Sequence, residues 1–488
     1  MNSRRARTRL AQVTFAALLI LIPAWTVLAN PALQPAPQTI REGQTRFGIV
    51  EAYYRPADAR DLNVGWERII FEWAQFQPTG PDDYVTAVIP DDWLIQANLA
   101  GREVIGLLKN TPHWASGSDK LGAPPTGLDL PIDDPGNYWA AFVRRTVQYY
   151  GERWGVNHWI IYNEPDLRPG EIGWYEFDGG VQDYYDMLKV AYMAAKSVNP
   201  DCVIHLAGMA WWTDKNAGRE PYLERLLEIA AWDADAYDYG FFFDVVMVHV
   251  YFSPLNVWNV IVETKGILEH YRLQGKPIWV DETNASPSFD PFAATPPDPP
   301  YHVSLSQQAD FVVQAAAMSL AAGVERFAIY RLYDDHFVPG TTEPWGLVRM
   351  DGSRRPAFEA YRTVINTFNG TRDAQWLHSQ RSSLVTLEQP GRTVYVMWAR
   401  SPDPVRFFVE AARYDEIAQQ IGVTGATRSW LPLVVPGVDG HWFALDAPGA
   451  IPGADDTVTV EGSPVMLVLE GPPRAVWIEV EGTEWKLR

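Results

Sequence analysis

Residues Trp159–Asp166 read WIIYNEPD, and this stretch decides how the rest of the chain is interpreted. Its first four residues are apolar, with aromatic and β-branched members, a pattern typical of a short buried strand. The strand leads directly into Asn163 and Glu164. Pro165 then ends it, because proline cannot donate to a hydrogen-bonded ladder and restricts the residue before it. The stretch therefore predicts a carboxylate, that of Glu164, held at the end of a strand.

A second stretch has the same design. Residues Pro277–Asn284 read PIWVDETN, an apolar strand that leads into Glu282. One such glutamate, taken alone, is more often a solvent-facing residue at a strand end. Two carboxylates delivered by two strand ends, however, are what cleavage of a glycosidic bond requires. The pair, rather than either residue, indicates function.

Short apolar runs alternate with longer amphipathic segments from Arg46 to about Asn369, a pattern that predicts a parallel sheet wrapped by helices. The predicted strands are Phe47–Glu51, Trp66–Phe71, Val104–Leu108, His158–Tyr162, Val203–Leu206, Val245–Val250, Pro277–Val280 and Arg326–Tyr330. The predicted helices are Tyr138–Tyr150, Gln182–Ser197, Tyr222–Ala231, Val257–Tyr271, Ser306–Ala322 and Pro356–Phe368. Because no glycine-rich phosphate loop is present in the sequence, we expect an α/β fold of the (β/α)8 TIM-barrel type over residues 46–370 rather than a doubly wound sheet.

Polar and aromatic residues follow most of the predicted strands, at the barrel end where the chemistry of such folds lies. Besides the two glutamates they are His113, Trp114, Asn163, Trp211, His249 and Tyr251, and the second predicted strand itself carries Arg68. Each has a structural interpretation: an ion-paired arginine, a hydrogen-bonded core histidine, or tryptophans of the core. Their shared position favours a common site.

The motifs Asn163–Pro165 and Trp279–Glu282 give residues 46–370 a resemblance to clan A of the retaining glycoside hydrolases. The chain is most similar to the family 39 group, which includes β-xylosidases, and families 5 and 30 share these features. The resemblance implies that Glu164 is the general acid/base and Glu282 the nucleophile. It also implies that Asn163 binds the 2-hydroxyl group of the sugar.

The resemblance further implies that Arg68 keeps the nucleophile ionised, and that His249 and Tyr251 contact the nucleophile and the substrate. One departure concerns the end of the eighth strand, where many relatives have a tryptophan. Here Tyr330–Tyr333 occupies that place, and Trp345 in the following loop is the candidate substitute.

The net charge of −20 argues against nucleic acid or an anionic membrane as a partner, because phosphate groups are bound by clustered Lys and Arg. A neutral oligo- or polysaccharide fits better, and no protein partner is implied. The single cysteine, Cys202, excludes an intrachain disulfide. No metal or organic cofactor is expected.

Residues 1–29 have the anatomy of a signal peptide, with a basic region, an apolar run and a Val27-Leu28-Ala29 cleavage site. An uncleaved anchor is the alternative, because apolar character from Leu10 to Ala29 approaches the ~20 residues that span a bilayer. Either way we expect a secreted or cell-surface protein. Residues 30–45 are interpreted as a flexible leader.

The pattern changes after Asn369 to short alternating runs, which predict a β-sandwich over residues 371–488. The predicted strands are Leu384–Leu387, Thr393–Trp398, Val405–Val409, Thr457–Val460 and Val465–Leu469. Structural support of the barrel is the expected role. Exposure of Trp430, Trp442 or Trp477 would favour a carbohydrate-binding module instead.

Two loops complete the predicted cleft. The loop Asp166–Gly180 carries Trp174, Tyr175 and Phe177 and is the candidate leaving-group subsite, while the proline-rich loop Ser286–Tyr301 is either a wall of the cleft or a solvated connector. The sequence thus predicts a secreted retaining β-glycosidase of the xylosidase, glucosidase or endoglycanase type. A catalytically silent barrel that binds glycans is the alternative, and a barrel enzyme of another chemistry is disfavoured because no metal-ligand cluster or phosphate loop is recognisable in the sequence.

Overall fold

The computed structural model describes most of the chain from Thr45 onward. The described ranges are 45–171, 175–292, 301–334, 344–452, 458–480 and 483–487. The predicted signal segment (1–29), nearly all of the predicted leader (30–45), Trp174 and residues 293–300 of the proline-rich loop lie outside them. Across the described ranges, no helix has both the length and the apolar character needed to cross a membrane.

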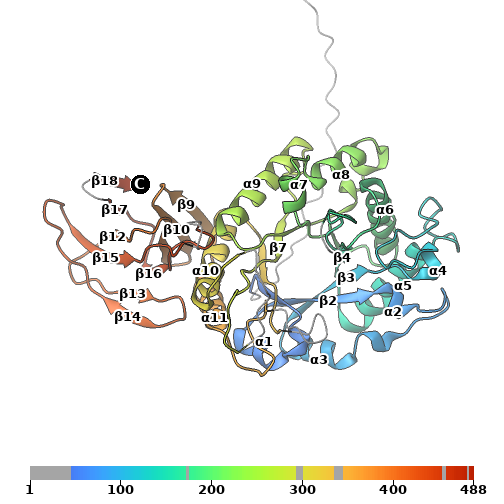
Figure 1. The fold of residues 1–488 in the computed structure, drawn as a ribbon, viewed down its shortest axis with the longest axis horizontal. Helices are drawn as coiled ribbons and strands as arrows, with labels where there is room; N and C mark the ends of the chain where they lie inside the picture. Colours follow the sequence, from blue (N-terminus) through green and yellow to red (C-terminus); the bar gives the residue numbers. More distant parts are fainter. Residues whose placement is uncertain are drawn as a thin grey trace, which may run out of the picture. The chain divides into compact units, whose positions relative to one another are not determined.

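Eight parallel strands form the barrel (Figure 1). They are β1 (Phe47–Val50), β2 (Trp66–Glu72), β3 (Glu103–Lys109), β4 (His158–Ile161), β5 (Val203–His205), β6 (Val246–His249), β7 (Ile278–Glu282) and β8 (Arg326–Ile329). Neighbours in the sheet follow the order β5-β4-β3-β2-β1-β8-β7-β6. Isolated parallel bridges, His205 with Val245 and Met209 with Val248, join β5 to β6 and close the circle. The predicted α/β barrel is therefore confirmed.

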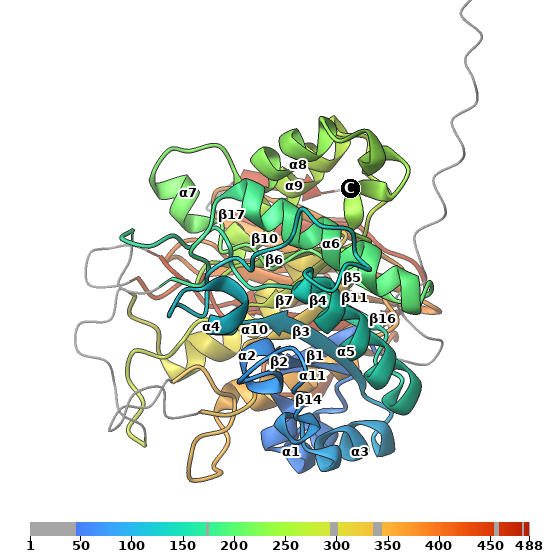
Figure 2. The ribbon, with the colours of Figure 1, turned by 90° about the vertical axis from the view of Figure 1, so that its right-hand side faces the viewer.

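Helices surround these strands (Figure 2). They are α1 (Pro56–Leu62), α2 (Trp73–Phe76), α3 (Asp91–Leu99), α4 (His113–Ser116), α5 (Tyr138–Trp154), α6 (Val181–Val198), α7 (Trp212–Asn216), α8 (Tyr222–Ala231), α9 (Pro254–His270), α10 (Leu305–Ala321) and α11 (Pro356–Phe368). Short 3-10 turns lie at η1 (Ala52–Tyr54), η2 (Thr86–Val88), η3 (Ala234–Tyr237) and η4 (Gly240–Phe242). All six predicted helices are present: α8 and α11 have the predicted bounds, and the other four differ at one or both ends.

Local sequence explains where these helices begin. Ser304 caps α10 by accepting from the backbone N–H of Gln307, whose side chain accepts from the N–H of Ser304 in return, a reciprocal capping box. In α9, Ser253 is the cap and Pro254 the first helical residue, where a missing N–H costs nothing. The start of α9 at Pro254 lies upstream of the predicted Val257 because the apolar pattern does not detect the cap.

In the described part of the chain after the barrel, ten antiparallel strands form two sheets. The six-stranded sheet has the order β14-β13-β16-β11-β10-β9, and the four-stranded sheet the order β15-β12-β17-β18. Their bounds are β9 (Asp373–His378), β10 (Ser382–Gln389), β11 (Arg392–Ala399), β12 (Val405–Ala411), β13 (Ala418–Ile421), β14 (Thr427–Trp430), β15 (His441–Ala447), β16 (Val465–Glu470), β17 (Val476–Val480) and β18 (Thr483–Leu487). The β-sandwich prediction is confirmed.

One predicted strand of the sandwich is wrong. Of the run Thr457–Val460, the described residues 458–460 contain no strand. The chain there enters a bend held by side chains, in which Arg400 binds Glu461 at 2.9 Å and Gln314 donates to the carbonyl of Gly462 at 2.8 Å. An alternating pattern cannot distinguish such a bound turn from a strand.

The three tryptophans that would favour a carbohydrate-binding module are not exposed. Trp442 is buried, and Trp430 and Trp477 are half-buried. Trp430 donates to the carbonyl of Ala444 at 3.0 Å, and Trp442 and Trp477 pack with ring centroids 5.1 Å apart. These contacts are those of core residues, so the structural role is favoured.

Helix α10 contacts both the barrel and the sandwich. Its residues from Gln307 to Leu320 are all buried. Gln307 donates to the carbonyl of Ile451 at 3.1 Å, and Ser463 donates to the carboxylate of Asp310 at 2.7 Å. The described residues accordingly fall within one compact unit.

Replacing Asp310 with asparagine is expected to stabilise the protein by about 1–3 kcal/mol at about pH 7.5. Burial raises the pKa of Asp310 to about 6, while the hydrogen bond from Ser463 opposes the rise. Between about pH 4 and 6, Asp310 is therefore protonated in the folded state and ionised in the unfolded state. As the pH rises through this range the free energy of unfolding falls, and the full loss is reached above about pH 6. Asparagine keeps the acceptor oxygen without the charge.

Urea unfolding of both proteins at about pH 7.5 and about pH 4 measures this effect. The advantage of the variant should shrink to a small fraction of its neutral value at the lower pH, where the aspartic acid is protonated in the folded state. An advantage independent of pH would contradict the electrostatic explanation.

Candidate active site

Two buried glutamates meet at the carboxyl end of the barrel. Glu164 follows β4 and is 7% exposed, and Glu282 is the last residue of β7 and is 5% exposed. One oxygen of each carboxyl group lies within 4.8 Å of the other and of a ring nitrogen of His249. The structure thus brings together the two side chains that the strand-end motifs singled out.

The backbone at Glu164 is held in an unusual conformation. Its φ of 40° lies in the left-handed region, which costs free energy for a residue with a side chain. The N–H of Glu164 donates to the carbonyl of Gly208 at 3.0 Å, and the N–H of Leu167 donates to the carbonyl of Glu164 at 3.0 Å. These bonds hold the backbone on both sides of Glu164.

Positive charge and a phenol surround Glu282. Arg68, on β2, pairs with one carboxylate oxygen, and Tyr251, after β6, donates its hydroxyl to the other. Burial opposes ionisation, but the attraction of Arg68 and His249 and the hydrogen bond from Tyr251 lower the pKa of Glu282 below its ordinary value. Glu282 is therefore ionised and presents a carboxylate to the site.

His249, the last residue of β6, lies between the two glutamates. Its Nδ1 is 2.8 Å from Oε1 of Glu164 and 3.6 Å from Oε2 of Glu282, and its Nε2 is 3.3 Å from Oδ2 of Asp281. Burial alone would lower the pKa of His249. The surrounding carboxylates, Glu282 and Asp281 first, instead raise it well above its ordinary value.

The pKa of Glu164 moves in the opposite direction to that of Glu282. Burial is the main cause, and together with repulsion from Glu282 it outweighs the attraction and hydrogen bond of His249, so that the pKa rises to about 7. Two carboxyl groups in one site therefore differ in protonation near neutral pH. Such a difference is the mark of an acid paired with an anion.

A glycine creates the space that His249 occupies. A Cβ atom at Gly208 would lie 2.0 Å from Nε2 of His249, so only glycine allows the ring to reach its position. Gly208 follows β5 and also accepts the hydrogen bond from Glu164. Sequence reasoning missed this residue because nothing in a lone glycine after a strand reveals what approaches it.

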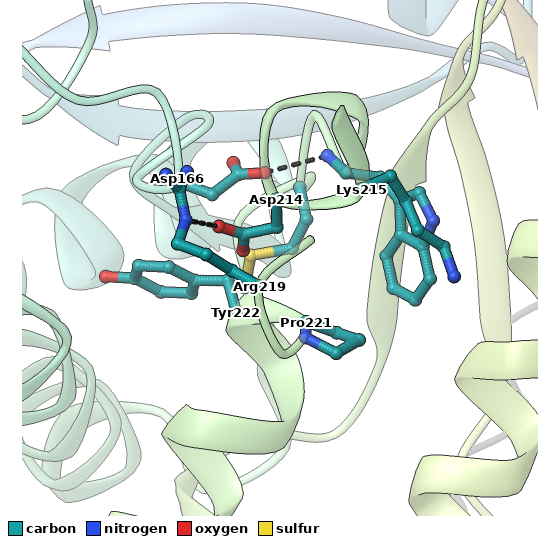
Figure 3. Close-up of a pocket in the computed structure, with 8 residues that line it drawn as sticks. Asp166, Asp214, Lys215, Arg219, Pro221 and Tyr222 are labelled. Carbon is teal, nitrogen blue, oxygen red and sulfur yellow. Dashed lines mark hydrogen bonds and ion pairs between the residues drawn. The ribbon is translucent and has the colours of Figure 1, made fainter. Parts of the chain in front are cut away.

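Asp166 ties the loop after β4 to the loop after β5. Its carboxylate accepts from the backbone N–H groups of Ala210 at 3.0 Å and Trp211 at 2.7 Å. Beside it, a small pocket is lined by Asp214, Arg219 and Tyr222 among others (Figure 3). Arg219 donates to Asp214 at 2.7 Å. This network fixes the segment that follows Glu164.

A cluster of aromatic rings adjoins Tyr251. The ring centroid of Trp345 lies 5.0 Å from that of Tyr251 and 6.2 Å from that of Tyr330. Asn284 holds the two loops together by donating to the carbonyls of both Tyr330 and Trp345 at 2.7 Å. Trp345 thus lies beside the strand-eight tyrosine, although the two are separated in sequence.

Two predicted binding residues have contacts with residues other than the glutamates. His113 begins α4 and faces solvent, with Nδ1 3.3 Å from Asp119. Trp114 donates to the carbonyl of Gln77 at 2.7 Å and packs edge-on against Trp73. These contacts do not join either side chain to the glutamates, and the binding role of the two residues stays a prediction.

The other candidates have mixed outcomes. Asn163 is half-buried and precedes Glu164. Trp211 is buried, and its backbone N–H donates to the carboxylate of Asp166. Phe177, a predicted subsite residue, is wholly buried and packs against Tyr162 at 5.0 Å, which corrects that prediction.

The amino-acid sequence matches no described protein family and no curated protein. Solved structures are nevertheless similar in fold. A family 39 glycoside hydrolase from the gut symbiont Bacteroides cellulosilyticus WH2 has a TM-score of 0.64 and 18% identity, over 88% of this chain and 81% of that chain.

Two further structures give the same result. A GH30 endoxylanase from Clostridium papyrosolvens C71 has a TM-score of 0.55 and 14% identity, over 88% of this chain and 98% of that chain. A family 51 α-L-arabinofuranosidase from Bifidobacterium longum has a TM-score of 0.52 and 12% identity, over 85% and 89%. The fold implied by the clan A resemblance is therefore confirmed.

Proposed function

We propose that this chain is a retaining glycoside hydrolase that cleaves β-linked bonds of neutral glycans through a covalent intermediate. The observation that carries the proposal is the pair Glu164 and Glu282, with oxygens within 4.8 Å and pKa values displaced in opposite directions. Carboxyl groups about 5–5.5 Å apart belong to retaining enzymes, whereas inverting enzymes need about 6.5–9.5 Å to admit a water molecule.

In the first step Glu282 is the nucleophile and Glu164 the acid. The Glu282 carboxylate attacks the anomeric carbon while the Glu164 carboxyl group donates its proton to the glycosidic oxygen, so that the leaving group departs as an alcohol. Arg68 and Tyr251 hold Glu282 ionised and oriented. The product is a glycosyl ester of Glu282 with the configuration inverted.

In the second step Glu164 becomes the base. Esterification removes the negative charge of Glu282, one of the causes of the raised pKa of Glu164, so that this pKa falls and the carboxylate persists. Glu164 takes a proton from water as the oxygen attacks the anomeric carbon, and the ester bond to Glu282 breaks. The second inversion restores the original configuration.

A neutral substrate follows from the charges of the chain and of the site. The net charge is −20, and the positive groups described beside the glutamates, Arg68 and His249, are already engaged with carboxylates. The predicted signal segment, residues 1–29, supports export from the cytoplasm to the outside, where such glycans are met.

Hydrolysis of a panel of substrates by residues 30–488 tests the proposal. The panel contains aryl β-xylosides, β-glucosides, β-galactosides and β-mannosides, together with neutral polysaccharides. We expect turnover of at least one β-glycoside, with NMR of the first-formed sugar showing the β anomer before mutarotation. A first-formed α anomer would contradict the retaining mechanism. Glycan binding without any hydrolysis would favour the silent-barrel alternative.

A further inference from the structure

Asp281 precedes Glu282 on β7 and is wholly buried. Its Oδ2 lies 3.3 Å from Nε2 of His249 and 3.2 Å from Nη1 of Arg68. A buried carboxylate is strongly destabilising unless charged partners compensate it. Asp281 has two such partners, and both are the cations that also contact the glutamates of the site.

The contact with Asp281 determines which way the histidine faces. The two ring nitrogens of imidazole lie on different sides of the ring. With Nε2 directed at Asp281, Nδ1 is directed at Glu164, 2.8 Å away, and at Glu282, 3.6 Å away. Arg68 is shared in the same manner, with Nη1 on Asp281 and Nη2 on Glu282.

We propose that Asp281 is a positioning residue, whose carboxylate holds His249 as an imidazolium between the two glutamates and anchors Arg68 beside Glu282. Its effect on catalysis rests on the glycosidase function proposed above, whereas the protonation of His249 does not. Three carboxyl groups face the imidazole: Glu164 after β4, and Asp281 and Glu282 on β7. Arg68 of β2 and Tyr251 after β6 in turn bind the carboxylate of Glu282.

An imidazolium has a specific advantage at this position. A neutral imidazole with a free lone pair on Nδ1 would accept the proton of Glu164 and leave no acid for the departing alcohol. A protonated ring can only donate, so Glu164 retains its own proton. With Asp281 present, His249 keeps its own proton, and Glu164 keeps the proton that it delivers to the leaving group.

The protonation of His249 can be measured without any substrate. The chain has nine histidines, so we would assign His249 in a histidine-labelled sample by comparison with His249→Gln and follow its ring 15N signals with pH. In the wild-type protein both nitrogens should remain protonated through neutral pH. In Asp281→Asn, which keeps the shape but not the charge, the ring should lose its proton at a pH lower by about one unit or more.

The pH dependence of kcat/KM gives the second readout. In the active enzyme both Glu164 and His249 carry a proton. Without the negative charge of Asp281, this pair loses its first proton at a lower pH, so the fall of kcat/KM on the alkaline side should also move to lower pH in Asp281→Asn. The activity at the optimum should fall roughly 10- to 100-fold, less than for loss of a general acid or base. Asp310→Asn makes the same chemical change in a buried aspartate away from the site, and its pH profile should equal that of the wild type.

Two results would overturn the proposal. One is a neutral His249 in the wild-type protein at about pH 6, a measurement that remains possible if Asp281→Asn does not fold. The other is an Asp281→Asn protein with an unchanged His249 titration and an activity lowered equally at every pH, which indicates a structural role only. Failure of the wild-type protein to hydrolyse any glycoside would refute the proposed function and leave the NMR result standing.

Discussion

Glu282→Ala is expected to lower the hydrolysis of aryl β-glycosides by on the order of 10^5-fold, with folding retained. The variant lacks the oxygen that attacks the anomeric carbon, and Arg68 and His249 are left facing an empty, positively charged space. Steady-state rates on the best substrate of the panel measure the loss. Glu152→Ala, a change on the exposed surface of α5, provides the matched control and should keep full activity.

The empty space in Glu282→Ala should accept a small anion. Azide attacking from that side displaces an activated phenol once, so the product is an α-glycosyl azide with inverted configuration. The anomeric configuration of the azide, read by NMR, identifies Glu282 as the nucleophile. Rapid hydrolysis by Glu282→Ala in the absence of azide would contradict this assignment.

Glu164→Ala is expected to have an effect that depends on the leaving group. A phenol of low pKa departs without a proton, so its release should be affected little, whereas glycosides with alkyl leaving groups should lose roughly 10^2- to 10^4-fold in kcat/KM. Azide should now trap the Glu282 ester and give a β-glycosyl azide with retained configuration. A uniform loss on all leaving groups would argue against an acid role for Glu164.

The pH profile offers a separate test of the same residue. In the wild-type enzyme Glu164 must be protonated, so activity should fall as the pH rises through its pKa of about 7. Glu282 must be ionised, and because its pKa is lowered, activity should fall only as the pH drops below the ordinary range of a glutamate. Glu164→Ala should lose the alkaline limb and keep the acidic one. Persistence of the alkaline limb would assign it to another group.

The barrel and the two glutamates could be predicted because their signals are local. The run WIIYNEPD contains the apolar strand, the residues that end it and the carboxylate within eight residues. The run PIWVDETN also places a carboxylate directly after an apolar strand. Parallel strands in a barrel deliver their ends to one rim, so residues far apart in sequence meet without further information. His249 and Tyr251, at the end of the sixth predicted strand, could be placed by the same rule. Arg68 lies within β2, and its place beside the nucleophile was implied by the family resemblance.

The remaining parts depend on contacts that no local pattern records. Asp281 was part of a quoted motif, yet only the fold shows that its side chain reaches both His249 and Arg68. Gly208 matters because an imidazole approaches it from another strand. The binding role of His113 stays a prediction, since position after a strand does not by itself give the direction of a side chain on the short helix that follows.

The burial of α10 has a consequence for how this protein can be divided. A surface helix of a barrel normally presents one polar face to water, but α10 is buried throughout Gln307–Leu320 and directs Gln307, Asp310 and Gln314 at the sandwich. A gene truncated after α11 would remove the sandwich partners of these three polar side chains and would uncover part of a helix that is otherwise buried. The sandwich is thus not a detachable module, and fusion or domain-shuffling experiments should move the barrel and sandwich as a single cassette.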